Sequence, residues 1–176
     1  MRSVIHWTAI VVLASLLSGC VPMPFPNGSG GRGNAPVPGT APPEISAQDW
    51  LNVDGPQSLA ELKGNVVLVE FWATWCGPCV QGIPHMNEMH EKYGGEGLRI
   101  VSLTDEDRET IESFQKRART PIDYPIGVGS PSSDTYGVEG IPQAFVVGRD
   151  GKIAWEGHPA DAECEQAIRK ALATPK

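Results

Sequence analysis

The chain has 176 residues and a formal net charge of −7 at pH 7, a length that suits one folded domain with an appendage rather than two large domains. Every acidic residue lies at or after Glu44, and residues 44–176 carry 12 basic and 21 acidic side chains, a net charge of −9. Because this excess of negative charge repels phosphate backbones, it argues against nucleic-acid binding as the main role of the domain.

The N-terminus has the pattern of an export signal. Arg2 precedes an apolar run over residues 4–17, which is too short to span a bilayer of about 30 Å but suits the hydrophobic region of a signal peptide. The sequence Leu-Ser-Gly-Cys that ends at Cys20 resembles a bacterial lipobox, in which the cysteine is lipidated and becomes the first mature residue. We therefore expect residues 1–19 to be a lipoprotein signal peptide. The alternative is an ordinary secretory signal with a chance cysteine.

Lipidation of Cys20 would place the protein on the extracytoplasmic, periplasmic side of a membrane. Val21, rather than aspartate, follows the cysteine. In a Gram-negative organism this choice favours the outer membrane.

Residues 20–43 form a segment rich in proline and glycine, without acidic side chains. Proline blocks helix and sheet hydrogen bonding while glycine keeps a chain flexible, so we expect a lipid-anchored linker. A peptide-recognition role for the prolines is the weaker alternative. This assignment leaves residues 44–176 as the folded domain, which is long enough to bury a core.

The domain alternates segments typical of strands and helices. Residues 66–72 form a continuous β-favouring run, the pattern of a strand buried on both faces of a sheet. Residues 78–93 place apolar side chains at helical spacing, and two glycines end this helix. The other expected elements are a short strand at 50–52, a helical turn at 58–63, strands at 98–103, 144–147 and 153–155, and helices at 107–119 and 161–173. This order, in which βαβ gives way to ββα, predicts an α/β sheet flanked by helices.

The motif that carries chemistry is Trp-Cys-Gly-Pro-Cys, which ends at Cys79, between the predicted strand and the predicted helix. A thiol attacks a disulfide only as a thiolate, and unpaired N–H groups at a helix N-terminus stabilise that anion and lower the pKa of the cysteine. Cys76 lies at this point, so we predict that it is the attacking thiol. Two intervening residues place Cys79 one turn inward as the resolving thiol, and Pro78 limits the available geometries.

Three other roles for the two cysteines are weaker. A zinc site needs two more ligands, and the spacing of His85 and His90 turns them to different faces of the predicted helix. Haem attachment needs a histidine directly after the second cysteine, where the chain has Val80. A purely structural disulfide would close so short a loop that it adds little stability. The sequence therefore favours a redox-active dithiol that requires no metal and no bound cofactor.

Glu70 stands in the middle of the apolar strand. Burial raises the pKa of a carboxyl group, so such a side chain can take up a proton near neutrality. We expect Glu70 to act as a general base for Cys79. The alternative is an edge strand from which the carboxylate reaches water, which the extra methylene relative to aspartate would allow.

These residues resemble the thioredoxin superfamily. Segment 69–79 looks like the thioredoxin active-site segment residue for residue, with two departures. Glu70 stands where thioredoxin has a buried aspartate, and Thr74 stands where an acidic residue is common. Pro84 matches the proline that kinks the family's helix, and the Gly-Ile-Pro that ends at Pro142 matches its cis-proline segment.

Further features resemble one branch of that superfamily. The upstream segment 58–64, the longer middle region 105–133 and the lipid anchor are similar to the TlpA/ResA-like membrane-tethered thiol-disulfide oxidoreductases. The resemblance covers residues 45–172 and implies a thioredoxin fold, in which helices flank a central mixed sheet, with an N-terminal extension. It also implies that the buried carboxylate deprotonates the resolving thiol.

The resemblance implies a substrate-binding surface around the cysteines. Pro142 would follow a cis peptide bond, and the backbone at Ile141 would pair with an extended segment of the substrate. Trp75 would add apolar docking surface beside Cys76, with Gly77 and Pro78 of the motif between the cysteines. The alternative for Pro142 is an ordinary trans loop before a strand.

For function, the resemblance and the Cys-Gly-Pro-Cys motif favour a reductase of disulfides in extracytoplasmic partner proteins, supplied by a membrane electron donor of the DsbD or CcdA type. Cytochrome c maturation is the best-known task of such proteins. A peroxiredoxin-like thiol peroxidase is one alternative, although it needs Thr-x-x-Cys and Thr74 lies two residues before Cys76. A non-catalytic, metal-carrying module is another, although copper chaperones of this superfamily have three residues between their cysteines.

For His158, Cys164 and the acidic residues at 105–107, we expect structural rather than catalytic roles. His158 is expected to be a surface histidine, with a role in tuning Cys76 as the alternative. Cys164 is expected to be a half-buried packing thiol on the last helix. The acidic residues at 105–107 are expected to begin a helix rather than to bind a metal.

Overall fold

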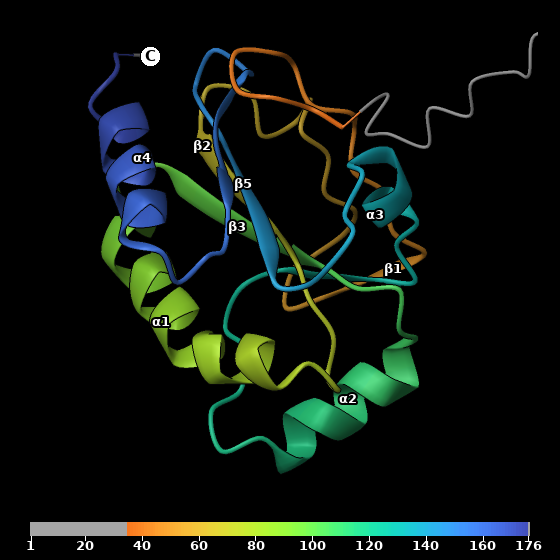
Figure 1. The fold of residues 1–176 in the computed structure, drawn as a ribbon. Helices are drawn as coiled ribbons and strands as arrows, with labels where there is room; N and C mark the ends of the chain where they lie inside the picture. The colour runs from red at the N-terminus through yellow and green to blue at the C-terminus, as the bar shows by residue number, and fades with distance from the viewer. Residues whose placement is uncertain (1–34, 176) are drawn as a thin grey trace, which may run out of the picture. The chain divides into compact units, whose positions relative to one another are not determined.

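The computed structural model describes residues 35–175 (Figure 1). The predicted signal peptide (1–19), the lipidation site Cys20 and the first part of the predicted linker lie outside the described residues. Within residues 35–175, no helix combines the length and the apolar character needed to cross a membrane.

The described chain contains six strands and four helices. The strands are β1 (Asp49–Leu51), β2 (Val66–Phe71), β3 (Leu98–Leu103), β4 (Ile126–Val128), β5 (Gln143–Val147) and β6 (Ile153–Gly157), and the helices are α1 (Gly77–Gly94), α2 (Arg108–Arg117), α3 (Ser132–Thr135) and α4 (Ala162–Leu172). The strands predicted around β1, β2, β3, β5 and β6 and the three long helices are confirmed. At 58–63 the chain forms the single turn predicted there, in which the N–H of Leu62 donates to the carbonyl of Ser58 (3.1 Å), and it does not continue into a helix. Strand β4 and helix α3, which are only three and four residues long, were not predicted from the sequence.

All six strands form one mixed sheet in the order β1-β4-β3-β2-β5-β6. Strand β2 runs parallel to β3 and antiparallel to β5, and β3 runs parallel to β4. Strand β2 is therefore central, with a hydrogen-bonded neighbour on each side. In this register Glu70 lies opposite Ser102 of β3 and Ala144 of β5.

The two faces of the sheet bury separate apolar clusters, because successive side chains of a strand point to opposite faces. Leu68 of β2 packs into the cluster that includes the buried side chains of α1 and α4. Val69 packs into the other cluster, with Trp50 and Tyr136. Figure 1 shows α1 and α4 together on one side of the sheet and α3 on the other. By this alternation Glu70 points to the same face as Leu68, beneath α1.

The described part of the predicted linker lies against the domain. Gly39 donates its N–H to the carbonyl of Ile153 (2.8 Å), and Ile153 donates back to Thr40 (2.9 Å). The hydroxyl of Tyr136 donates to the carbonyl of Pro43 (2.8 Å). The packed part of the chain therefore begins upstream of Glu44, the first residue of the domain predicted from composition.

Candidate active site

Cys76 and Cys79 form a disulfide at the N-terminus of α1, with their Cα atoms 5.2 Å apart. Cys76 is the N-cap residue, and its sulfur accepts a hydrogen bond from the backbone N–H of Cys79 (3.2 Å). The first turn of α1 contains no acidic side chain. In the reduced protein, the same N–H groups and the helix dipole favour a thiolate at Cys76.

Glu70 is buried at 3 % exposure in the central strand of the sheet. The alternative of an edge-strand carboxylate in water is therefore excluded. Burial raises its pKa from 4.5 to about 7, and hydrogen bonds from Ser102 and Tyr124 oppose this rise. The hydroxyl of Ser102 donates to one carboxylate oxygen of Glu70.

A small cavity lies between Glu70 and the resolving cysteine. Its volume is about 10 Å³, which is the size of one water molecule. The residues that line it come from β2, α1, the segment before β5 and the loop between β6 and α4; they include Glu70, Cys79, His85, Pro142 and His158. The structure thus brings two histidines to the inner side of the cysteine pair, although His158 itself is exposed.

Cys164 approaches the same region from α4 but has a different character. Its thiol is free and fully buried, more so than the half-buried position expected. Burial raises its pKa to about 12, and the charge of Glu70 adds to that rise. A thiol with such a pKa stays protonated and unreactive near neutral pH, in keeping with a packing role.

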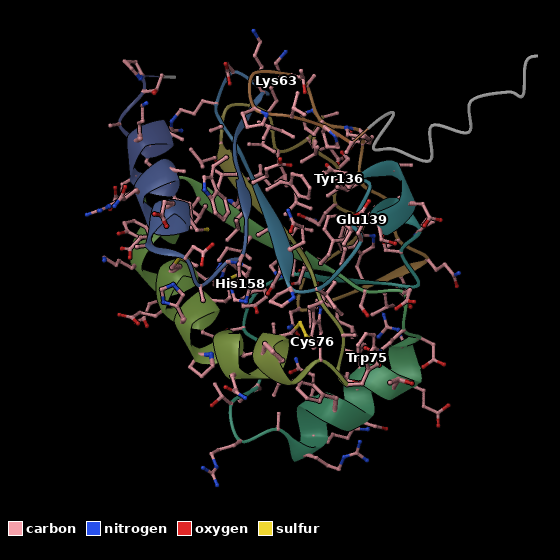
Figure 2. The ribbon with its side chains drawn as sticks, viewed as in Figure 1. Lys63, Trp75, Cys76, Tyr136, Glu139 and His158 are labelled. Atoms are coloured by element: carbon pink, nitrogen blue, oxygen red, sulfur yellow. A yellow bond between two sulfur atoms is a disulfide. The ribbon has the colours of Figure 1, made fainter. Side chains whose placement is uncertain are left out.

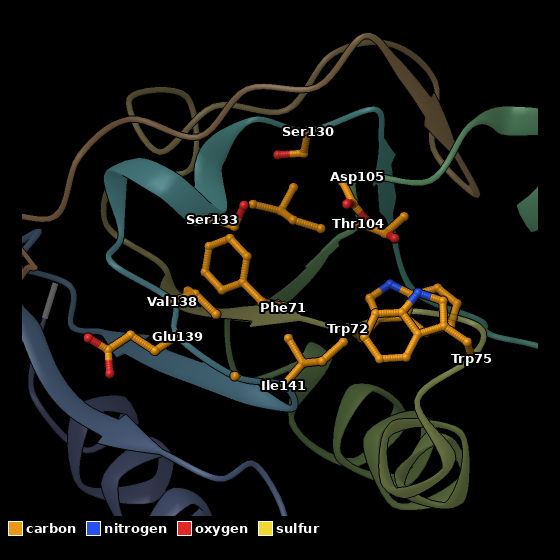
Figure 3. Close-up of a pocket in the computed structure, with 12 residues that line it drawn as sticks. Phe71, Trp72, Trp75, Thr104, Asp105, Ser130, Ser133, Val138, Glu139 and Ile141 are labelled. Carbon is orange, nitrogen blue, oxygen red and sulfur yellow. The ribbon is translucent and has the colours of Figure 1, made fainter.

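A wider groove lies on the outer side of the cysteine pair (Figure 3). It has a volume of about 420 Å³, and its lining includes Trp75 and Ile141. Trp75 is 73 % exposed. The Ile141–Pro142 peptide bond is cis, as the sequence predicts. In the view of Figure 2, Cys76 lies between Trp75 and His158.

The predicted substrate-binding residues therefore divide between two sides. Trp75 and Ile141 line the outer groove. Pro78 and Pro142 line the small inner cavity. Gly77 begins α1 and belongs to neither lining, with nothing within 4 Å of where a side chain would start.

Glu106, whose role was not predicted from the sequence, contacts the loop that carries the motif. Its carboxylate accepts hydrogen bonds from the backbone N–H of Thr74 (2.7 Å) and from the Thr74 hydroxyl (2.6 Å). Of the acidic residues at 105–107, only Asp107 caps α2 as expected, accepting from the N–H of Thr110 (2.8 Å). Thr74 stands where the family commonly has an acidic residue. That difference in the sequence could have suggested that an acidic side chain from elsewhere in the chain contacts this position.

The metal-ligand alternative gains no support within the described part of the chain. No group of three or more His, Cys, Asp or Glu side chains is arranged to hold a metal ion there. His85 lines the inner cavity, whereas His90 lines a separate hollow with Asn87 and Asp123.

Comparison with known proteins places this site in a family. Residues 38–156 match the AhpC/TSA family. The chain belongs to this family. Among curated relatives, it is 34 % identical over 115 residues to "Thiol-disulfide oxidoreductase ResA" of Bacillus thuringiensis subsp. konkukian, a match that covers 64 % of this chain and 66 % of the relative. It is 28 % identical over 96 residues to ResA of Bacillus subtilis, covering 54 % of each chain. The chain thus spans just under two thirds, or less, of these two relatives.

Solved structures agree with the family assignment. A crystal structure from Chlorobium tepidum assigned to a thiol:disulfide interchange protein DsbE is 31 % identical, with a TM-score of 0.66, over 79 % of this chain and 100 % of that chain. A second Chlorobium tepidum protein, a thiol:disulfide interchange protein of the thioredoxin family, is 26 % identical with a TM-score of 0.63, over 78 % and 98 %. The predicted thioredoxin fold and the similarity to the TlpA/ResA-like branch are confirmed.

Proposed function

We propose that this AhpC/TSA family member is an extracytoplasmic thiol-disulfide oxidoreductase that reduces disulfides in partner proteins. The observation that carries the proposal is the Cys76–Cys79 disulfide at the start of α1. A buried carboxyl group lies on its inner side and an exposed tryptophan on its outer side. A short-loop disulfide between a proton acceptor and a docking surface suits exchange better than structural support.

The first step forms a mixed disulfide. In the reduced protein, the thiolate of Cys76 attacks one sulfur of the partner's disulfide, a new S–S bond forms, and the partner's S–S bond breaks. The partner's other sulfur leaves as a thiolate and takes a proton from solvent. The N–H of Cys79 and the start of α1 stabilise the attacking anion before this step.

The second step releases the reduced partner. The thiol of Cys79 gives its proton to the carboxylate of Glu70, and the resulting thiolate attacks the sulfur of Cys76. The Cys76–Cys79 disulfide forms and the S–S bond between Cys76 and the partner breaks. The partner's sulfur leaves as a thiolate that takes up a proton, so both of the partner's sulfurs are reduced. A pKa of about 7 allows Glu70 to accept this proton near neutrality. The one-water cavity beside Glu70 offers the proton a path toward His158 and solvent.

The oxidised protein must then be reduced again with two electrons. We propose that a membrane donor of the DsbD or CcdA type supplies them. The lipobox pattern at Cys20 supports a lipid-anchored protein on the periplasmic side, and Val21 supports the outer membrane in a Gram-negative organism. The resemblance to the TlpA/ResA-like branch supports cytochrome c maturation as the setting and apocytochrome thiols as the product.

The test is the reduction potential of the full chain, measured by tryptophan fluorescence in defined thiol-disulfide buffers. The reduction potentials of reductants with this fold are about −270 mV and those of strong oxidants about −120 mV, a difference of roughly 7 kcal/mol. A value at the low end is expected. A value at the high end would make the protein an oxidant or isomerase, and the absence of a reversible two-electron transition would refute the redox function.

The same preparation tests the two alternatives. Peroxide consumption would reveal a thiol peroxidase. We do not expect it, because Thr74 is two residues before Cys76 rather than three, and its hydroxyl donates a hydrogen bond to Glu106. Stoichiometric metal in the reduced protein would indicate a metal carrier.

A further inference from the structure

One residue that lines the outer groove, Trp72, carries a buried donor without a partner among residues 35–175. The indole N–H of Trp72 is inaccessible to solvent and makes no hydrogen bond in the described structure, while the whole side chain is 3 % exposed. Trp72 lines the groove at the end where Trp75 stands (Figure 3). A buried N–H that lacks an acceptor is costly, so a small shift of the indole that exposes this N–H to an acceptor on a bound molecule would be favoured.

The walls of the groove are apolar on the inside. Phe71 and Leu103 are buried side chains from the ends of β2 and β3, and Val138 and Ile141 approach from the loop before β5. Its volume of about 420 Å³ leaves space for a large apolar side chain with its backbone.

The rim of the outer groove carries negatively charged side chains. Asp105 and Glu139 are both exposed and both line the groove, on opposite sides in Figure 3. No lysine, arginine or histidine is among the lining residues. Glu106 lies next to the rim, but its carboxylate already accepts hydrogen bonds from Thr74. A basic side chain of a bound molecule would meet an unpaired carboxylate on either side of the groove.

We propose that the groove binds an extended, basic segment of the partner protein next to its disulfide. A bulky apolar side chain of that segment packs between Phe71 and Ile141. The indole of Trp72 shifts enough to expose its N–H, and a backbone carbonyl of the segment accepts it. Lys or Arg side chains of the segment then reach the carboxylates of Asp105 and Glu139. This inference rests on the proposed function, because it names the class of partner that the cysteine pair would reduce.

The kinetic test uses two short disulfide peptides that differ at one position. Both carry a leucine near the disulfide, and the flanking residue is Lys in one and Glu in the other. The reduced full chain should reduce the Lys peptide with a kcat/KM about tenfold higher at low ionic strength. The ratio should shrink toward one at about 0.5 M salt, because salt screens exposed charges.

Reversing the charges on the rim of the groove tests whether these carboxylates cause the preference for the Lys peptide. The double variant Asp105→Lys, Glu139→Lys should reverse the ranking of the two peptides. Glu91→Lys, an exposed charge change on α1 outside the groove, should preserve the wild-type ranking. Equal rates for the two peptides in the wild type, or an unchanged ranking in the double variant, would overturn the basic-partner proposal.

A spectroscopic test addresses Trp72 without depending on a core variant. A Cys79→Ser protein holds the Lys peptide as a mixed disulfide, and the indole N–H resonance of Trp72 should move downfield when the peptide carbonyl accepts it. An unmoved resonance would contradict the predicted hydrogen bond. Reduction of the uncharged hydroxyethyl disulfide separates the two hypotheses: its absence defeats the proposed function, whereas its presence without peptide selectivity defeats only the inference.

Discussion

The two sides of the Cys76–Cys79 pair differ in size, exposure and charge. On the inner side, Glu70 is buried beside a cavity of about 10 Å³. On the outer side, Trp75 is 73 % exposed over a groove of about 420 Å³ with carboxylates on its rim. The inner side has room for a proton and one water, whereas the outer side has room for a polypeptide.

The cis-proline segment separates these two sides. Ile141 lines the outer groove, and the next residue, Pro142, lines the inner cavity. Recognition of a partner and transfer of a proton can therefore be altered independently, although the same pair of sulfurs serves both. The following predictions test that separation.

The largest effect is expected from Cys79→Ser. Without the resolving thiol, the mixed disulfide between Cys76 and the partner cannot be released by the protein, so turnover with a protein disulfide should stop. Non-reducing electrophoresis should show one partner molecule linked to each chain. Cys164→Ser serves as the control. Because Cys164 is buried with a raised pKa, its loss should leave turnover unchanged and no adduct should accumulate.

Glu70→Gln should impair the inner side alone. Glutamine cannot accept a proton, so release of the partner at pH 7 should slow by about 100-fold. In the wild type, the release rate should rise with pH as the carboxyl group ionises and level off above its pKa of about 7. Stopped-flow fluorescence of the mixed disulfide's decay measures both effects.

Two outcomes would contradict this assignment of Glu70. One is an unchanged release rate in Glu70→Gln, and the other is the same loss in Glu88→Gln, which alters an exposed carboxylate on α1. Binding of the partner should be unaffected in both variants, since neither residue lines the outer groove.

The pKa of Glu70 also predicts how stability varies with pH. The folded protein keeps this proton up to about pH 7, whereas the unfolded chain loses it near 4.5. Between these values the folded state binds more protons, so the Glu70 contribution to the unfolding free energy should fall as pH rises, by about 3 kcal/mol in total. Urea unfolding of the oxidised protein at pH 5 and pH 8 should show this fall, and Glu70→Gln should remove it. An equal fall in the variant would assign it to other groups.

The smallest effect is expected from Glu106→Ala, which alters the loop between the two sides. The variant loses a charged acceptor of two hydrogen bonds from Thr74, a change worth about 2 kcal/mol of unfolding free energy. Glu91→Ala, at an exposed position on α1, should change stability by less than about 0.5 kcal/mol. Chemical denaturation of both variants makes the comparison, and equal stabilities would show that the Thr74 contacts contribute nothing.

Local sequence patterns predicted most of the strands and helices, but they did not predict the two shortest elements, β4 and α3. The apolar run of β2 and the helical spacing of α1 are long enough for their periodicity to be clear. Strand β4 and helix α3 are too short to show a period, and their positions depend on pairing with β1 and β3 and on packing against the sheet. Composition placed the domain boundary at Glu44, but the backbone hydrogen bonds of Gly39 and Thr40 to β6 connect residues far apart in the chain.

For the site, the sequence alone determined the residues whose chemistry depends on neighbours in the chain. Cys76 and Cys79 lie one helical turn apart after a strand, and Glu70 lies within that strand, so local spacing was enough to name them. Only the tertiary structure decided what surrounds them. Glu106 contacts Thr74 from a different loop. Trp72, whose buried N–H has no acceptor among the described residues, lines a groove that forms only when β2, β3 and the loop before β5 assemble. Contacts between segments distant in sequence leave no periodic pattern, which is why these features became visible only in the folded chain.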